Sequence, residues 1–467
     1  MALQTDRQKM AHVLRRFGLG ASEAELNFYS AKGFEAGIDT LLNYEDTDEG
    51  FDLRPDAAID KKGKVNFNLL ILWWITRLLV TQRPLQEKMT LFWHNHFATS
   101  AEKVKGTGNM YNQNLLLRAN ATGNFRTLLH AVSKDPAMIF WLDTQEDRVG
   151  HPNENFAREV MELFTLGVGN YTEHDIQQSA RAYTGWSIRR VPGTQASAMP
   201  SQEFIYRPRL HDDTPKTFFG KTGDFDGDQI LDMLCDMERN SEFIVWKLWT
   251  FFAYAKPEDS VVSKYAKIFR DNNLEIKPLL KAIMMGDEFY SAKADRTMFK
   301  NPCDISVATA RQLGIGAAIA ANLKQIGPDG VAPRGPVSAV AVSMKNQGME
   351  LFYPPDVAGW RLGQNWISSA TLIARIQWGE QLYGQSKSKV PQVFVNPYSI
   401  FASDTSPEGV ARELVKLYDA GTPESKISSL VAAAKNVCGN QVTEENAAAT
   451  AAQVSRIIFA TPEFQFS

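Results

Sequence analysis

Helical periodicity runs through nearly all of this chain, and it constrains the fold more than any other feature of the sequence. Apolar residues recur at intervals of three and four positions, the spacing that gives a helix one apolar face. The pattern covers residues 69–80, 85–97, 111–121, 124–134, 153–166, 173–184, 228–237, 241–254, 276–285 and 301–313, and it returns in an Ala-rich tail at 408–435 and 443–458. Thr172, followed by Asp175, is close to a capping box and predicts a helix that begins at Glu173.

Strand-like alternation is scarce by comparison. The best candidates are WSIRR at 186–190 and EFIYR at 203–207, separated by a stretch that contains Gly, Ser and Pro. Two short alternating segments joined in this way predict a β-hairpin within residues 186–210. The predicted fold class is therefore all-α, a mainly helical, bundle-like body with a small β-hairpin insertion.

The length of 467 residues exceeds what one simple core usually organises, so the division of the chain needs its own prediction. A break in the helical pattern runs from 384 to 408. We expect residues 1–385 to form one helical domain with a single large core. Residues 386–467 are expected to form a C-terminal helical extension packed on the same body.

Composition and charge exclude several classes of protein. The chain is 44% hydrophobic and 22% charged, as in an ordinary globular protein. A net charge of −3 gives no overall basic footprint, so we expect no nucleic-acid partner. The three cysteines, Cys235, Cys303 and Cys438, match neither a zinc spacing nor a disulfide framework and are predicted to be buried, reduced thiols.

Neither a membrane span nor a leader is visible in the sequence. The longest apolar run, LLILWWITRLLV at 69–80, contains Thr76 and Arg77 and is too short to cross a bilayer. It predicts a buried helix and no transmembrane segment. The N-terminal stretch is polar and basic and lacks the apolar region of a secretory signal. As written, the chain is expected to be cytoplasmic, or exported if a leader has been removed.

All seven histidines lie within the first 211 residues, and two of them share the motif QEKMTLFWHNHFATS at 86–100. On a helix, Glu87 and His94 lie on the same face, whereas His96 is turned away from His94 by roughly 200°. The two histidines converge only if the helix ends near Asn95. Two interpretations stay open: a metal site, or one histidine bonded within an aromatic core while the other caps the helix end.

A second motif, HPNENFAREVMELFTLGVGNYTEHD at 151–175, predicts an almost wholly apolar helix with one narrow polar stripe. The stripe contains Asn155, Arg158, Glu159 and Glu162, at intervals of three and four positions. Two glutamates one turn apart are suited to binding a metal or to acting as an acid/base pair. The alternative is an internal Arg158–Glu162 ion pair, with Glu159 reaching the surface.

Two further segments complete the candidates. His211 is followed by Asp212 and Asp213, which would supply metal ligands or a base with its orienting carboxylate. LFYPPDVAGW at 351–360 predicts a rigid elbow that packs against the body. The sequence contains no GxSxG, Walker A, dinucleotide-binding or HExxH motif, which disfavours the common hydrolase, nucleotide-hydrolase and Rossmann classes.

Taken together, the motifs resemble the bacterial family known as domain of unknown function 1800. The resemblance rests on FGLGAS, LFWHNHFATS, NENFAREVMELFTLGVGNYTEHDI, ARAYTGW, HDDTPKTFFGK, YPPDVAGW and NWISS, which extend in order from about residue 10 to 385. It implies no established reaction. It does imply an exported protein, because members of the family are often secreted. It also implies a sulfatase-like or phosphatase-like partner, because genes of that kind often neighbour those of the family. This chain departs from the pattern in showing no leader and in having Phe164 where many relatives have histidine.

Two functions follow as hypotheses. The first is a metal-assisted, hydrolase-like enzyme with a divalent metal as its cofactor. Its predicted residues are Glu159, Glu162 and His211 as catalytic groups and Glu87, His94, His96 and Asp212 as metal ligands. The second is a non-catalytic binding or structural partner of a neighbouring hydrolase or of a surface polymer. In that case the same residues form a satisfied buried network that fixes the helix packing.

Overall fold

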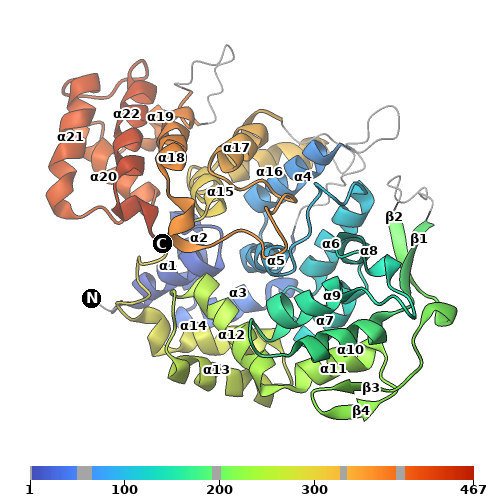
Figure 1. Cartoon of the computed structure of the whole chain (residues 1–467). Coiled ribbons are helices and arrows are strands. Elements are labelled where there is room, and N and C mark those ends of the chain that lie inside the picture. The colour runs from blue at the N-terminus through green and yellow to red at the C-terminus, as the bar shows by residue number, and fades with distance from the viewer. Residues whose placement is uncertain (1–2, 50–65, 192–200, 327–333, 385–394) are drawn as a thin grey trace.

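The computed structural model describes residues 3–49, 66–191, 201–326, 334–384 and 395–467. The described part is mostly helical, as predicted (Figure 1). The first helices are α1 (Asp6–Phe17), α2 (Glu23–Ser30), α3 (Phe34–Leu42), α4 (Phe67–Val80), α5 (Pro84–His96), α6 (Thr107–Ala119), α7 (Phe125–Ser133), α8 (Pro136–Trp141), α9 (Glu154–Glu159) and α10 (Glu173–Tyr183). A π-helical turn, Val160–Thr165, directly continues α9.

The later helices complete the body and the tail. They are α11 (Gly227–Asp236), α12 (Glu238–Phe252), α13 (Asp259–Asp271), α14 (Ile276–Met285), α15 (Pro302–Gln312), α16 (Ile315–Ile326), α17 (Arg334–Asn346), α18 (Ser369–Gln381), α19 (Pro397–Ile400), α20 (Pro407–Leu417), α21 (Glu424–Cys438) and α22 (Ala447–Ala460). The helical pattern at 408–435 therefore covers two helices, since α20 ends at Leu417 and α21 begins at Glu424.

Local signals explain where several helices begin. The predicted capping box is present at α10, where Thr172 and Asp175 bond each other's backbone N–H groups. Asn301 and Asp304 do the same at α15, with Pro302 at the first helical position. These contacts satisfy N–H groups that the first turn of a helix leaves without partners.

The four strands within the described ranges form two separate hairpins. β1 (Trp186–Val191) pairs with antiparallel β2 (Ser201–Tyr206), with Trp186 opposite Tyr206, which confirms the predicted hairpin. β3 (Lys216–Phe218) pairs with β4 (Lys221–Gly223). The sequence did not predict this second hairpin, because three residues are too few to display alternation. Residues 192–200, which join β1 to β2, lie outside the described residues.

Buried apolar side chains form two clusters, and α5 lies between them. The first cluster draws on α1–α3, α7 and α9–α14, and includes Leu85, Met89 and Trp93 of α5. The second draws on α4 and α15–α22, and includes Leu91 of α5. Consequently, the helix that carries the His-Asn-His motif is buried almost throughout, and only Gln86 and Asn95 are partly exposed.

The last helices pack back onto the second cluster. α22 lies against α18, and α20 and α21 pack beside it (upper left in Figure 1). The boundary expected at residues 385 and 386 falls outside the described residues, so the division into domain and extension stays a prediction. The three cysteines are free and buried, as predicted. No helix within the described ranges is long and apolar enough to cross a membrane.

Candidate functional site

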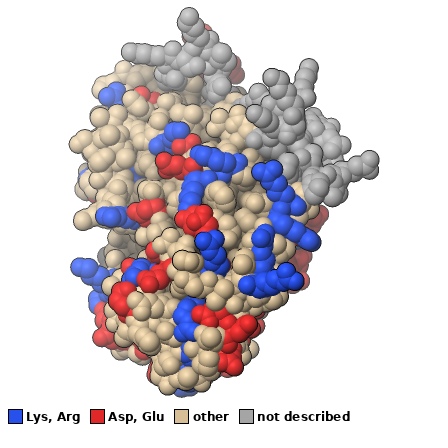
Figure 2. Space-filling view, turned by 45° about the vertical axis from the view of Figure 1, so that its right-hand side comes forward, with Lys and Arg blue, Asp and Glu red and all other residues tan. Residues whose placement is uncertain are grey.

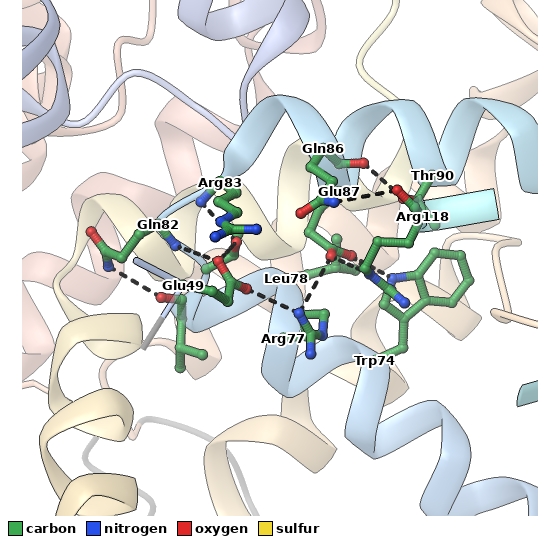
Figure 3. Close-up of polar contacts among 12 residues, drawn as sticks. Glu49, Trp74, Arg77, Leu78, Gln82, Arg83, Gln86, Glu87, Thr90 and Arg118 are labelled. Carbon is green, nitrogen blue, oxygen red and sulfur yellow. Dashed lines mark hydrogen bonds and ion pairs between the residues drawn. The ribbon is translucent and has the colours of Figure 1, made fainter. Parts of the chain in front are cut away.

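Glu87 lies at the centre of a buried ion-pair network on α5 (Figure 3). Its carboxylate accepts two hydrogen bonds from Arg118, at 2.5 Å from Nε and 3.1 Å from Nη2. Trp74 Nε1 donates a third bond at 3.0 Å, and Arg77 Nη1 lies 4.0 Å away. Burial alone would raise the pKa of Glu87, but the two arginines hold this pKa below its usual value. The arrangement neutralises the carboxylate within the protein.

His94 shares its surroundings with Glu87, as the spacing of seven predicted. Its ring lies 5.2 Å from that of Trp74 and is also packed against Phe352 and Trp360. Nε2 accepts a hydrogen bond of 3.2 Å from the backbone N–H of Phe352. That bond makes Nε2 the unprotonated ring nitrogen. Burial lowers the pKa of His94 to about 3, so the ring is neutral.

His96 points to a different element, because α5 stays helical through His96. Its Nε2 lies 3.1 Å from the carbonyl oxygen of Phe164, within the π-helical turn. A carbonyl can only accept, so Nε2 carries the proton. Burial and the nearby Lys247 lower the pKa of His96 well below its usual value. His94 and His96 therefore do not converge on a common point.

The π-helical turn explains why a histidine is needed there. A wider turn displaces backbone carbonyls from their usual helical partners. In addition to His96, side chains of α12 bond the next two carbonyls: Asn240 Nδ2 reaches Thr165 at 3.4 Å, and Arg239 Nε reaches Leu166 at 2.9 Å. The turn is thus held by polar side chains from two neighbouring helices.

Glu159 and Glu162 lie on either side of the junction between α9 and this turn, and both are partly exposed. Tyr171 donates its hydroxyl to Glu162. Burial, and then the charge of Glu162, raise the pKa of Glu159. Arg158 bonds Glu173 at 2.7 Å and lies 3.5 Å from Glu154, so the alternative of an internal Arg158–Glu162 pair was wrong. The charge of Glu162 therefore acts on the carboxyl group of Glu159.

His211 and Asp212 are used by the loop before β3. His211 Nδ1 lies 2.8 Å from the carbonyl oxygen of Thr184. Asp212 accepts from Arg181 Nε at 2.8 Å and from the backbone N–H of Thr214 at 3.0 Å. The bonds from Arg181 and Thr214 lower the pKa of Asp212, so this carboxylate is ionised and paired.

The structure therefore brings together Glu87 with His94, and Glu159 with Glu162, as two separate groups. Within the ranges that the structure describes, no three His, Cys, Asp or Glu side chains are close enough to hold a metal ion. Each predicted ligand has a protein partner: Arg118 for Glu87, Phe352 for His94, Phe164 for His96 and Arg181 for Asp212. These partners lie 31 to 258 positions away, and the sequence carried no signal for them.

Sequence reasoning also missed an arginine surface at the base of the β1–β2 hairpin. It is formed by Arg148, Arg207 and Arg209, all exposed. A hydrogen bond of 2.8 Å from Val149 N to Leu210 O joins the two loops that carry them. None of the three forms an ion pair with a described residue, whereas Arg189 on β1 is paired with Glu203. Figure 2 shows Lys and Arg side chains gathered on the face turned toward the viewer, with acidic groups interspersed. The two arginines of RPR at 207–209 were the available signal, whereas nothing in the sequence pointed to Arg148.

Comparison with known proteins yields one match. A family model described as Protein of unknown function (DUF1800) matches residues 12–466, nearly the whole chain. No curated protein and no solved structure matches.

Proposed function

The chain belongs to the DUF1800 family, and from that premise we propose that it is a non-catalytic binding protein with an acidic partner. The observation that carries the proposal is that the polar residues of the motifs are bonded within the protein, whereas, among the described residues, the arginine surface is not. The histidines and Glu87 of the family-like motifs are bonded inside the protein. The arginine surface, by contrast, is exposed and forms no ion pair with any part of the chain that the structure describes.

Arginine suits this role because its planar guanidinium donates two parallel hydrogen bonds to a carboxylate, phosphate or sulfate group. The partly exposed Tyr206 and Val149 lie beside the arginines in sequence and add apolar contact area. We propose an acidic surface polymer, or an acidic face of a sulfatase-like or phosphatase-like protein, as the partner. In either case binding weakens as salt screens the charges.

The test uses polygalacturonate, an acidic polysaccharide, as the probe. The triple variant Arg148→Gln/Arg207→Gln/Arg209→Gln is expected to bind it at least tenfold more weakly than the parent at 50 mM salt. The matched control replaces three arginines that are already paired, the exposed Arg7 and Arg412 and the partly exposed Arg158. Isothermal titration calorimetry measures both. Equal affinity of the two triple variants would refute the arginine surface as the binding site.

One observation favours the metal-assisted hydrolase as a second candidate. Glu159 has a raised pKa and lies beside Glu162, as expected of an acid/base pair. The two functions are separated by measuring the metal content of the parent protein and of the variants His94→Ala and Glu159→Ala, all purified without chelator. The enzyme predicts stoichiometric metal that both variants lose. The binding protein predicts a large loss of stability in His94→Ala and a small one in Glu159→Ala.

A further inference from the structure

A cavity of about 430 Å³ lies between α2, the turn that joins α4 to α5, and the start of α16. Small-molecule sites in proteins usually have volumes of about 300–1,000 Å³. The described residues that line the cavity include neither the arginine surface nor any of the predicted catalytic or metal-binding residues. The cavity is therefore a separate candidate site with room for a small molecule, and what it binds does not depend on the proposed function.

Arg311 of α15 holds the walls of the cavity together. Its Nη1 donates to three carbonyl oxygens at the end of α4 and directly after it, at distances of 3.0 to 3.1 Å. Its Nη2 bonds Glu25 of α2 at 2.6 Å. α16 lies directly against α4, since a Cβ at Gly316 would be 2.1 Å from the carbonyl oxygen of Leu79. These contacts lie within the folded chain, so the cavity is formed before any ligand binds, as is usual for small-molecule sites.

The charged side chains of the lining are already paired. They are Glu23, Glu25 and Arg311. Glu25 accepts from Arg311 and from the hydroxyl of Ser22, both at 2.6 Å, and Glu23 is paired with Arg7. Because these charges are balanced, a neutral ligand enters the cavity without leaving an uncompensated charge, whereas an ionised ligand does not.

The lining also offers apolar and aromatic surface. Leu79, Val80 and Pro84 are buried residues that contribute to it. Phe28, which also lines the cavity, is 61% exposed, and a ligand that covers its ring removes apolar surface from water. The rings of Phe28 and Tyr29 lie 5.0 Å apart at an angle of 85°, so they present a ring face and a ring edge together. Aromatic ligands pack favourably against both.

Two polar groups of the lining are available to a ligand. Tyr29 is 6% exposed, and its hydroxyl makes no hydrogen bond with a described residue. Burial, and then the charge of Glu25, raise the pKa of Tyr29, so the hydroxyl keeps its proton and can donate it. The side-chain amide of Gln312 is likewise unbonded among the described residues, and it can donate or accept. A ligand that carries an acceptor would therefore satisfy the hydroxyl of Tyr29.

We propose that this cavity binds a neutral aromatic small molecule, whose ring system packs against Phe28 and whose carbonyl oxygen accepts a hydrogen bond from Tyr29. An ionised analogue of the same shape finds no free counter-charge in the described lining, because Glu25 and Arg311 neutralise each other. The site therefore discriminates by charge between ligands of equal size.

The test uses 2-naphthamide and 2-naphthoate, which share their rings and a carbonyl group and differ in charge. Isothermal titration calorimetry of the full chain is expected to show that 2-naphthamide binds about tenfold more tightly than 2-naphthoate, or better. Equal affinities, or no measurable binding of 2-naphthamide, would overturn the proposal. The triple variant of the arginine surface is expected to bind 2-naphthamide as the parent does, so this site and the proposed function can fail independently.

Two variants locate the bound amide. Ala317→Trp extends an indole from an exposed position of the lining and is expected to weaken binding about tenfold or more, since it fills the space of the ligand. Ala318→Trp, the next residue of α16, is equally exposed and lies outside the lining, so this matched control is expected to keep the parent affinity. The proposal is wrong if the two tryptophan variants bind 2-naphthamide equally well.

Tyr29→Phe removes only the hydroxyl and is expected to weaken binding of 2-naphthamide about fivefold, the contribution of one hydrogen bond. It tests the site even if Ala317→Trp fails to fold, because the hydroxyl that it removes has no partner among the described residues. Unchanged affinity in Tyr29→Phe would exclude the proposed hydrogen bond and with it this placement of the ligand.

Discussion

Glu87 offers the sharpest test of whether the buried polar groups of α5 serve packing or chemistry. The substitution Glu87→Gln keeps the size of the side chain and an oxygen that can still accept from Trp74. It removes the negative charge that faces Arg118 and Arg77. Because Glu87 is fully buried and the Arg118 side chain is 7% exposed, water cannot replace the lost interaction.

The magnitude follows from the contacts. Breaking a buried ion pair by removing one partner costs about 3–5 kcal/mol, since the remaining charge is left without compensation. We therefore expect Glu87→Gln, and separately Arg118→Met, to lower the free energy of unfolding by about 3 kcal/mol or more. The double variant Glu87→Gln/Arg118→Met combines the two substitutions and removes both charges of the pair, while Arg77 keeps Glu49 as its partner. It is expected to lose much less than the two single losses combined, because no unpaired charge remains.

Urea denaturation followed by circular dichroism measures these free energies. Arg158→Met is the matched control, because its pair with Glu173 is exposed and is worth about 1 kcal/mol or less. The reasoning is refuted if Glu87→Gln costs less than the control. It also fails if the double variant is as unstable as the single losses added together, since that would exclude coupling between the two side chains.

Two further predictions concern other buried groups. Burial raises the pKa of Asp135 to about 7, against an unfolded value near 4, so its contribution to stability is fully present below pH 4 and is lost as the pH rises through 7. Asp135→Asn is expected to abolish this loss of stability, which amounts to at most about 4 kcal/mol. The variant should therefore be more stable than the parent at pH 8 but not at pH 4. Urea titrations measure both proteins at both pH values, and an identical dependence of stability on pH in parent and variant would contradict the prediction. Gly359 has φ +79, and a Cβ there would lie 2.4 Å from the backbone and side-chain oxygens of Asn95, so Gly359→Ala is expected to cost more than about 2 kcal/mol. Gly363→Ala, at φ +71 with open space, is expected to cost about 1 kcal/mol, and equal melting temperatures of the two variants would rule out the contact with Asn95 as the cause.

Sequence signals predicted the fold well where an element depends on interactions between residues that are close in sequence. The buried helix α4 and the start of α10 follow from apolar spacing and from a capping box, both of which lie within a few residues. The presence of the β1–β2 hairpin follows from alternation in two short segments. The π-helical turn after α9 was not predictable in this way. Its apolar pattern matches an ordinary helix, and the turn depends on side chains of α5 and α12 that bond its carbonyls.

The role of the candidate site residues was likewise not predictable from local sequence. Spacing along a helix places Glu87 and His94 on one face, and the structure agrees, since both contact Trp74. The spacing of residues along a helix does not determine whether that face contacts a ligand or another part of the chain. The answer came from Arg118 and from the backbone N–H of Phe352, which lies 258 positions from His94. A histidine that accepts a backbone hydrogen bond and one that binds a metal use the same lone pair. The residue type is therefore equally suited to both roles, and only the partner distinguishes them. For that reason, measuring stability and metal content together on one variant of His94 tests the function more directly than a further sequence motif would.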